Sequence, residues 1–161
     1  MSTSDDGGVP DDLPRLRTVA DYQFGADVGA ALFPDDADIG IKRSSSGRPQ
    51  QVIADDGRLV TYGTDGRFTI GLAGGRRIAA ALPAPAGRVV AGDESEPFVR
   101  DGRNAFAKFV QRADGRIRPR DEVLVEHVDG SLLAVGRAEL SGEGMVDFES
   151  GMAVHVRDST G

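Results

Sequence analysis

The stretch EPFVRDGRNAFAKFV, residues 96–110, decides the fold of the second half of this chain. It holds a short helix beginning near Pro97, a Gly-Arg-Asn turn at residues 102–104 and a strand, and another short strand at residues 88–90 precedes it. These elements follow one another with almost no spare residues. Such economy is typical of a small, compact domain.

Strand signals continue beyond this stretch. Asp-Gly pairs at residues 114–115 and 129–130 mark turns. The apolar residues around the second turn supply the inward-facing positions of strands: Val123, Val125, Leu132, Leu133 and Val135. Gly136 also lies in a predicted strand, where glycine indicates a bulge or a tight bend. We therefore predict a small barrel, closed or nearly closed.

The first half has helical and then strand patterns. Apolar residues from Leu16 to Leu32 recur at helical spacing, and Gly25 and Gly29 interrupt them, so one helix or two short ones satisfy the pattern. Four strand candidates follow, separated mainly by Asp-Gly turns, and predict an antiparallel meander: residues 39–42, 51–54, 59–62 and 68–72. A closing helix is expected around Arg76, and Pro83 ends it.

These patterns divide the chain into domains. The segment PAPAG, residues 83–87, is the best interdomain boundary. We predict an α+β fold in which a helix-plus-antiparallel-sheet domain at residues 15–83 packs on a β-barrel at residues 88–158. Residues 1–14 are rich in Asp and Gly and are expected to form a disordered acidic tail, because they cannot bury enough apolar surface to order themselves.

The composition is acidic. Asp and Glu number 26 against 19 Lys and Arg, which gives a formal net charge of −7. Of the acidic residues 19 are Asp, and of the basic residues only 2 are Lys. Proteins of halophiles use such a surface to stay soluble in concentrated salt, so we expect a halophilic archaeon as the source. Molar salt and negative charge both weaken attraction to phosphate, so nucleic-acid recognition would depend on short-range contacts.

Several classes of chemistry are disfavoured. The chain has no Cys, which excludes a disulfide framework, a thiolate nucleophile and a Cys-based zinc site, and its two His lie far apart. No catalytic constellation is recognisable, so we expect no enzyme activity, no metal and no cofactor. No apolar run approaches membrane-spanning length, so we expect a soluble cytoplasmic protein with no membrane partner.

Two groups of segments resemble a known family. In the second half, four segments resemble the PUA domain, a small RNA-binding barrel, in the order that this family uses: residues 96–110, 117–125, 133–138 and 151–157. In the first half, ADYQFG (residues 20–25) and AALFP (residues 30–34) resemble the domain that precedes the PUA domain in archaeal tRNA-guanine transglycosylase. Together the resemblances cover residues 16–157. One departure is Arg120, where the family often has Gly.

The resemblance implies a function. In that family these C-terminal domains grip tRNA, while a separate barrel installs the archaeosine precursor with aspartates and a zinc held by Cys and His. We therefore expect this chain to correspond to the tRNA-binding part alone. It would be a non-catalytic tRNA-binding protein that assists a modifying enzyme in trans. Two alternatives remain: a PUA factor that acts on the ribosome or on rRNA, and a protein-interaction module without RNA binding.

Candidate RNA-binding residues follow from the same resemblance. PUA domains bring their backbone against RNA at the position of Gly102, Arg103 and Asn104, where glycine allows close approach and arginine can fork onto phosphate. Arg100 and Lys108 flank this turn as further phosphate contacts.

Two further groups are candidates with plainer alternatives. Arg76 and Arg77 would extend the basic surface of the first half, although near a helix C-terminus they would also stabilise the helix dipole without any ligand. Phe98, Phe106 and Phe109 could stack on unpaired bases, but strand phenylalanines are mostly core, and we expect at best one of them to be exposed.

Overall fold

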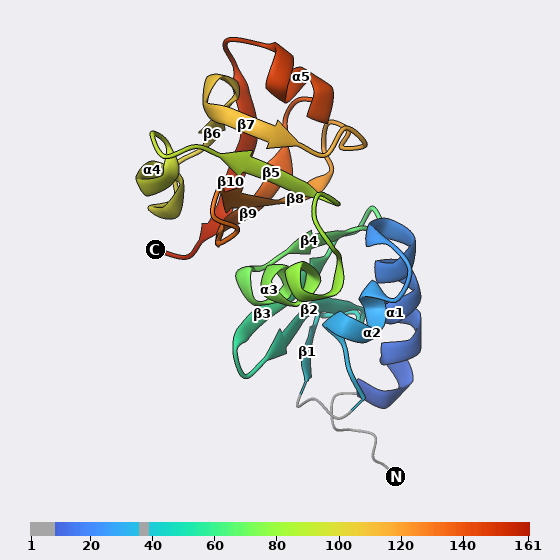
Figure 1. Cartoon of the computed structure of the whole chain (residues 1–161). Coiled ribbons are helices and arrows are strands. Elements are labelled where there is room, and N and C mark those ends of the chain that lie inside the picture. The colour runs from blue at the N-terminus through green and yellow to red at the C-terminus, as the bar shows by residue number, and fades with distance from the viewer. Residues whose placement is uncertain (1–8, 36–38) are drawn as a thin grey trace. The chain divides into compact units, whose positions relative to one another are not determined.

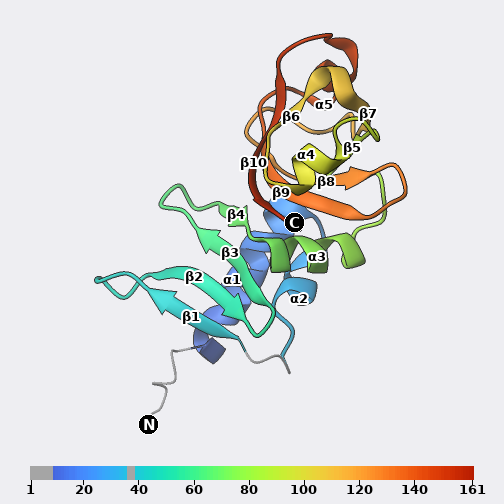
Figure 2. The same cartoon turned by 90° about the vertical axis from the view of Figure 1, so that its left-hand side faces the viewer.

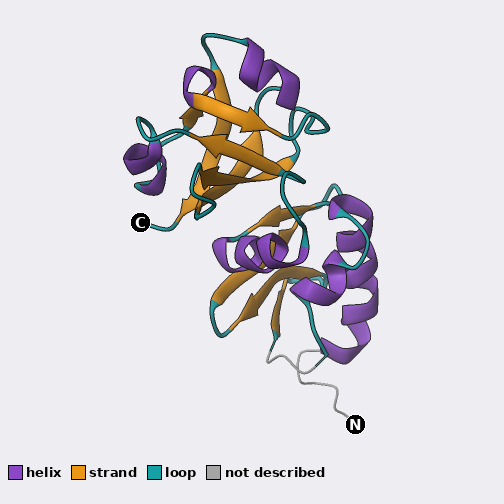
Figure 3. Cartoon of the chain, in the orientation of Figure 1, coloured by secondary structure: helices purple, strands orange, loops and turns teal. Residues whose placement is uncertain are grey.

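The protein was analysed as a computed structural model that describes residues 9–35 and 39–161 (Figure 1). The chain divides into two compact units, residues 1–81 and residues 82–161, here called unit 1 and unit 2. Figure 3 shows helices and strands in both units, and the predicted α+β class is confirmed. Among the described residues no helix is long and apolar enough to cross a membrane.

Unit 1 contains three helices, α1 (Val9–Phe24), α2 (Val28–Leu32) and α3 (Leu72–Ala81). Of the two alternatives for the first of these segments, the split helix is correct. Gly25 separates α1 from α2 with a φ of 134°, a conformation open to glycine. Gly29, expected as a second break, instead lies inside α2. A Cβ at Gly29 would come within 2.3 Å of the Arg17 carbonyl oxygen, so glycine lets α1 and α2 approach closely.

The predicted acidic tail at residues 1–14 is wrong for its last part. Residues 1–8 lie outside the described residues, but residues 9–14 belong to α1. Leu13 is buried together with Leu16, which lies nearly one turn further along the same helix face. Asp12 forms an ion pair with Arg43 of the first strand. Leu13 therefore gains burial once the helix extends backwards from Leu16.

Unit 1 also contains an antiparallel sheet with the strand order β1-β2-β3-β4, so the predicted meander is confirmed. Its strands are β1 (Gly40–Arg43), β2 (Pro49–Ala54), β3 (Gly57–Tyr62) and β4 (Phe68–Ile70). Figure 2 shows the three helices along one side of this sheet. The rings of Phe33 and Phe68 meet edge to face there, with centroids 5.9 Å apart, and both side chains are fully buried.

Unit 2 is built around a six-stranded sheet with the order β6-β10-β9-β8-β5-β7. The strands are β5 (Arg88–Ala91), β6 (Ala105–Phe106), β7 (Val110–Ala113), β8 (Glu122–His127), β9 (Leu132–Ala138) and β10 (Met152–Ser159). Only β5 and β8 pair in parallel; the other neighbours are antiparallel. The sheet curls into a near-barrel (Figure 1), as predicted.

Short helices and one apolar core complete unit 2. α4 (Glu96–Arg100), the 3-10 helix η2 (Ala107–Phe109) and α5 (Gly142–Asp147) lie between its strands. Buried side chains from nearly all of these elements form a single cluster that includes Val99, Leu133 and Met145. The stretch at residues 96–110 begins as predicted, with a short helix, a turn and a short strand, but the strand ends at Phe106 and residues 107–109 form η2 instead. Val99, Ala105 and Ala107 are all buried in this core.

The predicted irregularity at Gly136 is also present. Gly136 of β9 faces Val156 of β10, and the register shifts between Val156 and Asp158. The extra residue of this bulge therefore lies on β10, opposite the glycine. A Cβ at Gly136 would come within 2.2 Å of the His155 carbonyl oxygen, so glycine is required for the two strands to approach this closely.

Candidate nucleic-acid interface

The Gly102–Asn104 turn follows directly after α4. Gly102 N donates to Val99 O at 2.9 Å and Arg103 N donates to Phe98 O at 2.9 Å, so the turn closes on the end of the helix. Gly102 has a φ of 98°, a left-handed conformation that side chains rarely adopt. This backbone leaves Arg103 exposed, and within the described parts of the chain its guanidinium has no ion-pair partner.

Asn104 has a structural task that the sequence did not reveal. Its side-chain Oδ1 accepts a hydrogen bond from Val156 N of β10 at 2.9 Å, and the residue is half-buried. This bond ties the turn to the sheet and occupies the amide oxygen of Asn104. Asn104 therefore positions Arg103 rather than presenting that oxygen at the surface.

The two cationic side chains that flank the turn differ in whether an acidic neighbour balances their charge. Arg100 lies in α4, where its Nε donates to Glu96 Oε2 at 2.6 Å, so its charge is balanced locally. Lys108 is exposed in η2, beyond β6 from the turn, and its Nζ lies 5.0 Å from the centroid of the Phe109 ring. Of the pair, Lys108 has the more accessible charge.

The expectation that at best one of the three phenylalanines is exposed is wrong. Phe98 is 55% exposed and Phe106 is 43% exposed, and Phe109 is half-buried. β6 has only two residues, so Phe106 lies at a sheet edge, and α4 buries Val99 while Phe98 faces outward. Unit 2 therefore offers two aromatic faces near Arg103 and Lys108 in sequence.

Arg76 and Arg77 lie in the middle of α3, so the expected stabilisation of a helix C-terminus does not apply. Arg77 donates to Leu32 O at 2.9 Å and pairs with Asp56 at 3.2 Å, which ties α3 to neighbouring elements. Arg76 is exposed. Both belong to unit 1, whereas the other five candidates belong to unit 2.

The turn at Arg120, where the family pattern has Gly, keeps a glycine-like backbone. Arg120 has a φ of 80°, its N donates to Ala138 O at 2.7 Å, and its side chain is exposed. The substitution therefore leaves the geometry of the turn in the left-handed region, with an arginine side chain added at the surface.

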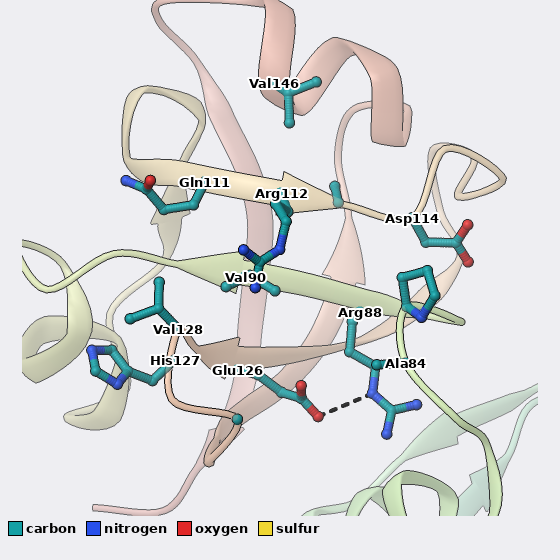
Figure 4. A pocket seen from close by; sticks show the side chains of 13 residues that line it. Ala84, Arg88, Val90, Gln111, Arg112, Asp114, Glu126, His127, Val128 and Val146 are labelled. Carbon is teal, nitrogen blue, oxygen red and sulfur yellow. Dashed lines mark hydrogen bonds and ion pairs between the residues drawn. The ribbon is translucent and has the colours of Figure 1, made fainter.

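Unit 2 also contains a pocket that sequence reasoning missed. It has a volume of about 620 Å³ and lies over β5, β7 and β8, with lining residues that include Val90, Arg112 and Glu126 (Figure 4). A buried ion pair forms one wall, in which Arg88 Nε lies 3.0 Å from Glu126 Oε2. Arg88 also donates to Leu82 O and Ala86 O. In the sequence, the pocket is indicated only by two charged residues within apolar strands. Their meaning becomes clear only when β5 and β8 are paired.

His127, at the end of β8, lies between two carboxylates. Its Nε2 is 2.6 Å from Asp93 Oδ1 and its Nδ1 is 3.1 Å from Asp129 Oδ1. The hydrogen bond with Asp93 and the contacts with Asp129 raise the pKa of His127 above its ordinary value, against a smaller opposing effect of desolvation. The pKa of Asp129 is lowered to about 2, mainly by hydrogen bonds from Ser131. Within the described residues no cluster of three His, Asp or Glu could hold a metal ion.

Comparison with known families decides the assignment. Residues 14–85 match the patch-forming domain C2 of tRNA-guanine transglycosylase, and residues 87–160 match the PUA domain. The chain is a C2 domain of the transglycosylase family followed by a PUA domain. Unit 2 is thus the PUA domain, and its near-barrel is the expected one.

Curated relatives carry the same pair of domains within longer chains. The chain is 44% identical over 149 residues to the tRNA-guanine(15) transglycosylase of Methanothermobacter thermautotrophicus, which covers 91% of this chain and 22% of that protein. It is 46% identical over 143 residues to the enzyme of Pyrococcus furiosus, which covers 88% of this chain and 24% of that protein. The aligned part is the C-terminal part of the transglycosylase, so the chain spans about a quarter of these relatives or less.

Solved structures share the fold of the whole chain. A hypothetical protein of Pyrococcus horikoshii superimposes with a TM-score of 0.72 at 19% identity, covering 92% of this chain and 90% of the other. A conserved PUA domain protein of Thermoplasma acidophilum superimposes with a TM-score of 0.64 at 16% identity, covering 95% and 91%. Other chains of similar length therefore share this fold.

Proposed function

We propose that this chain binds RNA, most specifically tRNA, through its PUA domain, and that it acts in tRNA modification without carrying out the chemistry itself. The observation that supports this most is the 44% identity to the C-terminal part of tRNA-guanine(15) transglycosylases. The alignment leaves more than three quarters of each of those enzymes unmatched. A partner in trans would then supply the catalytic step.

The surface of the PUA domain supports a contact at the Gly102–Asn104 turn. Arg103 is exposed and has no ion-pair partner among the described residues, so its guanidinium can bind a phosphate in a bidentate manner. Phe98, in the helix that carries the turn, offers an exposed ring on which an unpaired base can stack. Lys108 adds a second accessible cation.

This arrangement also explains how an acidic protein could bind RNA. With a net charge of −7 the chain as a whole repels phosphate, and the long-range component of binding is weak. One free arginine and one stacking ring act over a few ångströms and are little affected by the net charge. Binding should therefore depend more on individual residues than it does in basic RNA-binding proteins.

A charge reversal at the turn tests the proposal. We expect Arg103→Glu to weaken binding of an archaeal tRNA transcript by tenfold or more, about 1.4 kcal/mol, because one phosphate contact is replaced by repulsion. The matched control is Arg118→Glu, since Arg118 is also exposed and the change in net charge is identical. Fluorescence anisotropy with labelled tRNA measures both, and circular dichroism checks that the fold is retained.

The outcome separates the candidate functions. Equal losses in the two variants would mean that net charge governs binding and would contradict a specific contact at Arg103. Stronger binding of an rRNA fragment than of tRNA would move the assignment to the ribosome. A wild-type protein that binds neither RNA would leave a protein-interaction module as the function.

A further inference from the structure

The pocket over β5, β7 and β8 lies on a part of the PUA domain that the proposed RNA contacts do not use. None of its lining residues belongs to α4, to the Gly102–Asn104 turn or to η2. Its volume of about 620 Å³ falls within the range of small-molecule sites, roughly 300–1,000 Å³. It therefore has the dimensions of a ligand site in its own right.

The walls of the pocket are mainly apolar. Val90 lies at its floor on β5, and Val128 and Val146 stand at its rim, where they are 44% and 46% exposed. Figure 4 shows the three side chains around the opening, with Arg112 reaching from β7 across Val90. Aliphatic side chains placed in this way can sandwich a flat ring, as apolar residues do in pockets that hold a nucleobase.

Two of the charged side chains that line the pocket, Arg112 and Glu126, have opposite signs and mark its two ends. Arg112 is exposed, and in the described chain its guanidinium has no hydrogen-bond or ion-pair partner. Glu126 is 8% exposed and is held by Arg88 through Oε2 only. Its Oε1 accepts no hydrogen bond from the described residues and is not among their buried unsatisfied atoms, so it is open to the pocket that the residue lines.

These groups specify the ligand. An ionised carboxylate only accepts hydrogen bonds, so Glu126 Oε1 requires a donor from whatever enters. A free guanidinium matches a phosphate. A nucleoside monophosphate whose base carries an amino group meets these requirements, because its flat ring bears a donor at one end and its phosphate is an anion at the other.

We propose that this pocket is a nucleotide-binding site in which Arg112 binds the phosphate and Glu126 Oε1 accepts a hydrogen bond from the amino group of the base. The Arg88–Glu126 ion pair orients the carboxylate. Guanine meets this requirement through its N2 amino group, and adenine and cytosine would meet it through theirs. Uracil presents a single N–H between two carbonyl oxygens, which the carboxylate repels. The chemistry of recognition is the same for a free nucleotide and for a nucleotide within an RNA chain.

Isotope-labelled full-length protein titrated with GMP, UMP and guanosine tests the site by NMR. We expect GMP to shift the amide signals of residues around Val90 and Glu126 and to bind at least tenfold more tightly than UMP. Arg112→Ala should weaken GMP binding about tenfold and leave guanosine binding unchanged, because guanosine has no phosphate. Arg118→Ala, an exposed arginine outside the pocket, is the matched control and should change neither.

The result has clear readings. Equal binding of GMP and UMP, or the same GMP affinity in wild type and Arg112→Ala, would overturn the proposal. Glu126→Gln should reduce the preference for GMP over UMP; because that variant also loses the partner of Arg88, the Arg112 variant decides if it fails to fold.

A short guanine-containing single-stranded RNA distinguishes the two sources of the nucleotide. If the RNA shifts the same amide signals, binds more tightly than GMP and binds more weakly to Arg112→Ala, the pocket binds a nucleotide within RNA. Shifts with GMP alone would assign it to a free nucleotide. The proposal for the Gly102–Asn104 turn is independent of this result, because its own test is tRNA binding by Arg103→Glu.

Discussion

At the scale of single residues, backbone conformation and hydrogen bonding decide roles that residue type alone leaves open. Arg103 and Asn104 are neighbours in one turn, yet Arg103 is free at the surface and Asn104 is bonded to β10. Arg120 retains a left-handed backbone without the glycine that favours it. His127 gains two carboxylate neighbours, one of them from the loop before α4. Each of these roles depends on a partner distant in sequence or on a φ value.

Arg120→Gly should stabilise the protein. The left-handed conformation costs a non-glycine residue about 1–2 kcal/mol, and glycine removes this cost. The greater conformational freedom of glycine in the unfolded chain offsets part of that stabilisation. We expect a net increase in the free energy of unfolding of up to about 1 kcal/mol, measured by chemical denaturation. Arg118→Gly, at an exposed position without a positive φ, is the control and should be slightly destabilising. A destabilised Arg120→Gly variant would contradict this account.

The pH dependence of stability should report on His127. Its pKa is raised in the folded state, mainly by the hydrogen bond with Asp93. The stabilisation is therefore fully present below the unfolded pKa of 6.5 and is lost as the pH rises through the higher folded value. We expect the Tm difference between wild type and His127→Gln to be larger at pH 6 than at pH 9. A difference that is constant with pH would mean that the pKa of His127 is the same in the folded and unfolded states.

At the scale of secondary-structure elements, close contacts between neighbouring helices and strands determine which residue types can occupy a position. α3 begins at Leu72, before the helix expected around Arg76, and Gly74 lies in its first turns. A Cβ at Gly74 would come within 2.0 Å of the Leu59 carbonyl oxygen on β3, so this glycine allows the helix to lie directly against the sheet. Helix propensity alone argues against glycine there, and the packing outweighs it. Gly136 follows the same logic between β9 and β10.

Gly136→Ala should separate β9 from β10. Its Cβ would come within 2.2 Å of the His155 carbonyl oxygen, a backbone atom that cannot rotate away. We expect a loss of about 1–3 kcal/mol in the free energy of unfolding, the usual range for overpacking. Gly115→Ala provides the control, because a Cβ there meets nothing within 4 Å. Equal stabilities of the two variants in a denaturant titration would show that the strands adapt without cost.

At the scale of the whole molecule, the chain consists of two units that each have their own core. The apolar cluster of unit 2 draws only on residues from Val89 to Val156. The net charge of −7 belongs to the whole chain and bears on solubility and association rather than on the fold. A halophilic source, suggested by that composition, stays a prediction.

Unit 2 should fold without unit 1. A fragment of residues 82–161 retains the complete apolar cluster and also Leu82 O, which accepts a hydrogen bond from Arg88. We expect a cooperative thermal transition and amide chemical shifts for core residues such as Leu133 and Met145 that match those of the full chain. Poor dispersion in the NMR spectrum of the fragment would show that unit 1 is needed for folding.

The sequence by itself determined most of the strands, their order and the family, but it did not indicate α5 or η2. Asp-Gly turns, apolar alternation and the segment at residues 96–110 suffice for these because they are local signals, each read within a few residues. Only the tertiary structure decided that residues 9–14 join α1, that both Phe98 and Phe106 are exposed, and that Arg88 and Glu126 form a buried pair in the wall of a pocket. These properties depend on which distant segments meet, and burial and ion pairing follow from that meeting rather than from any single stretch of the chain.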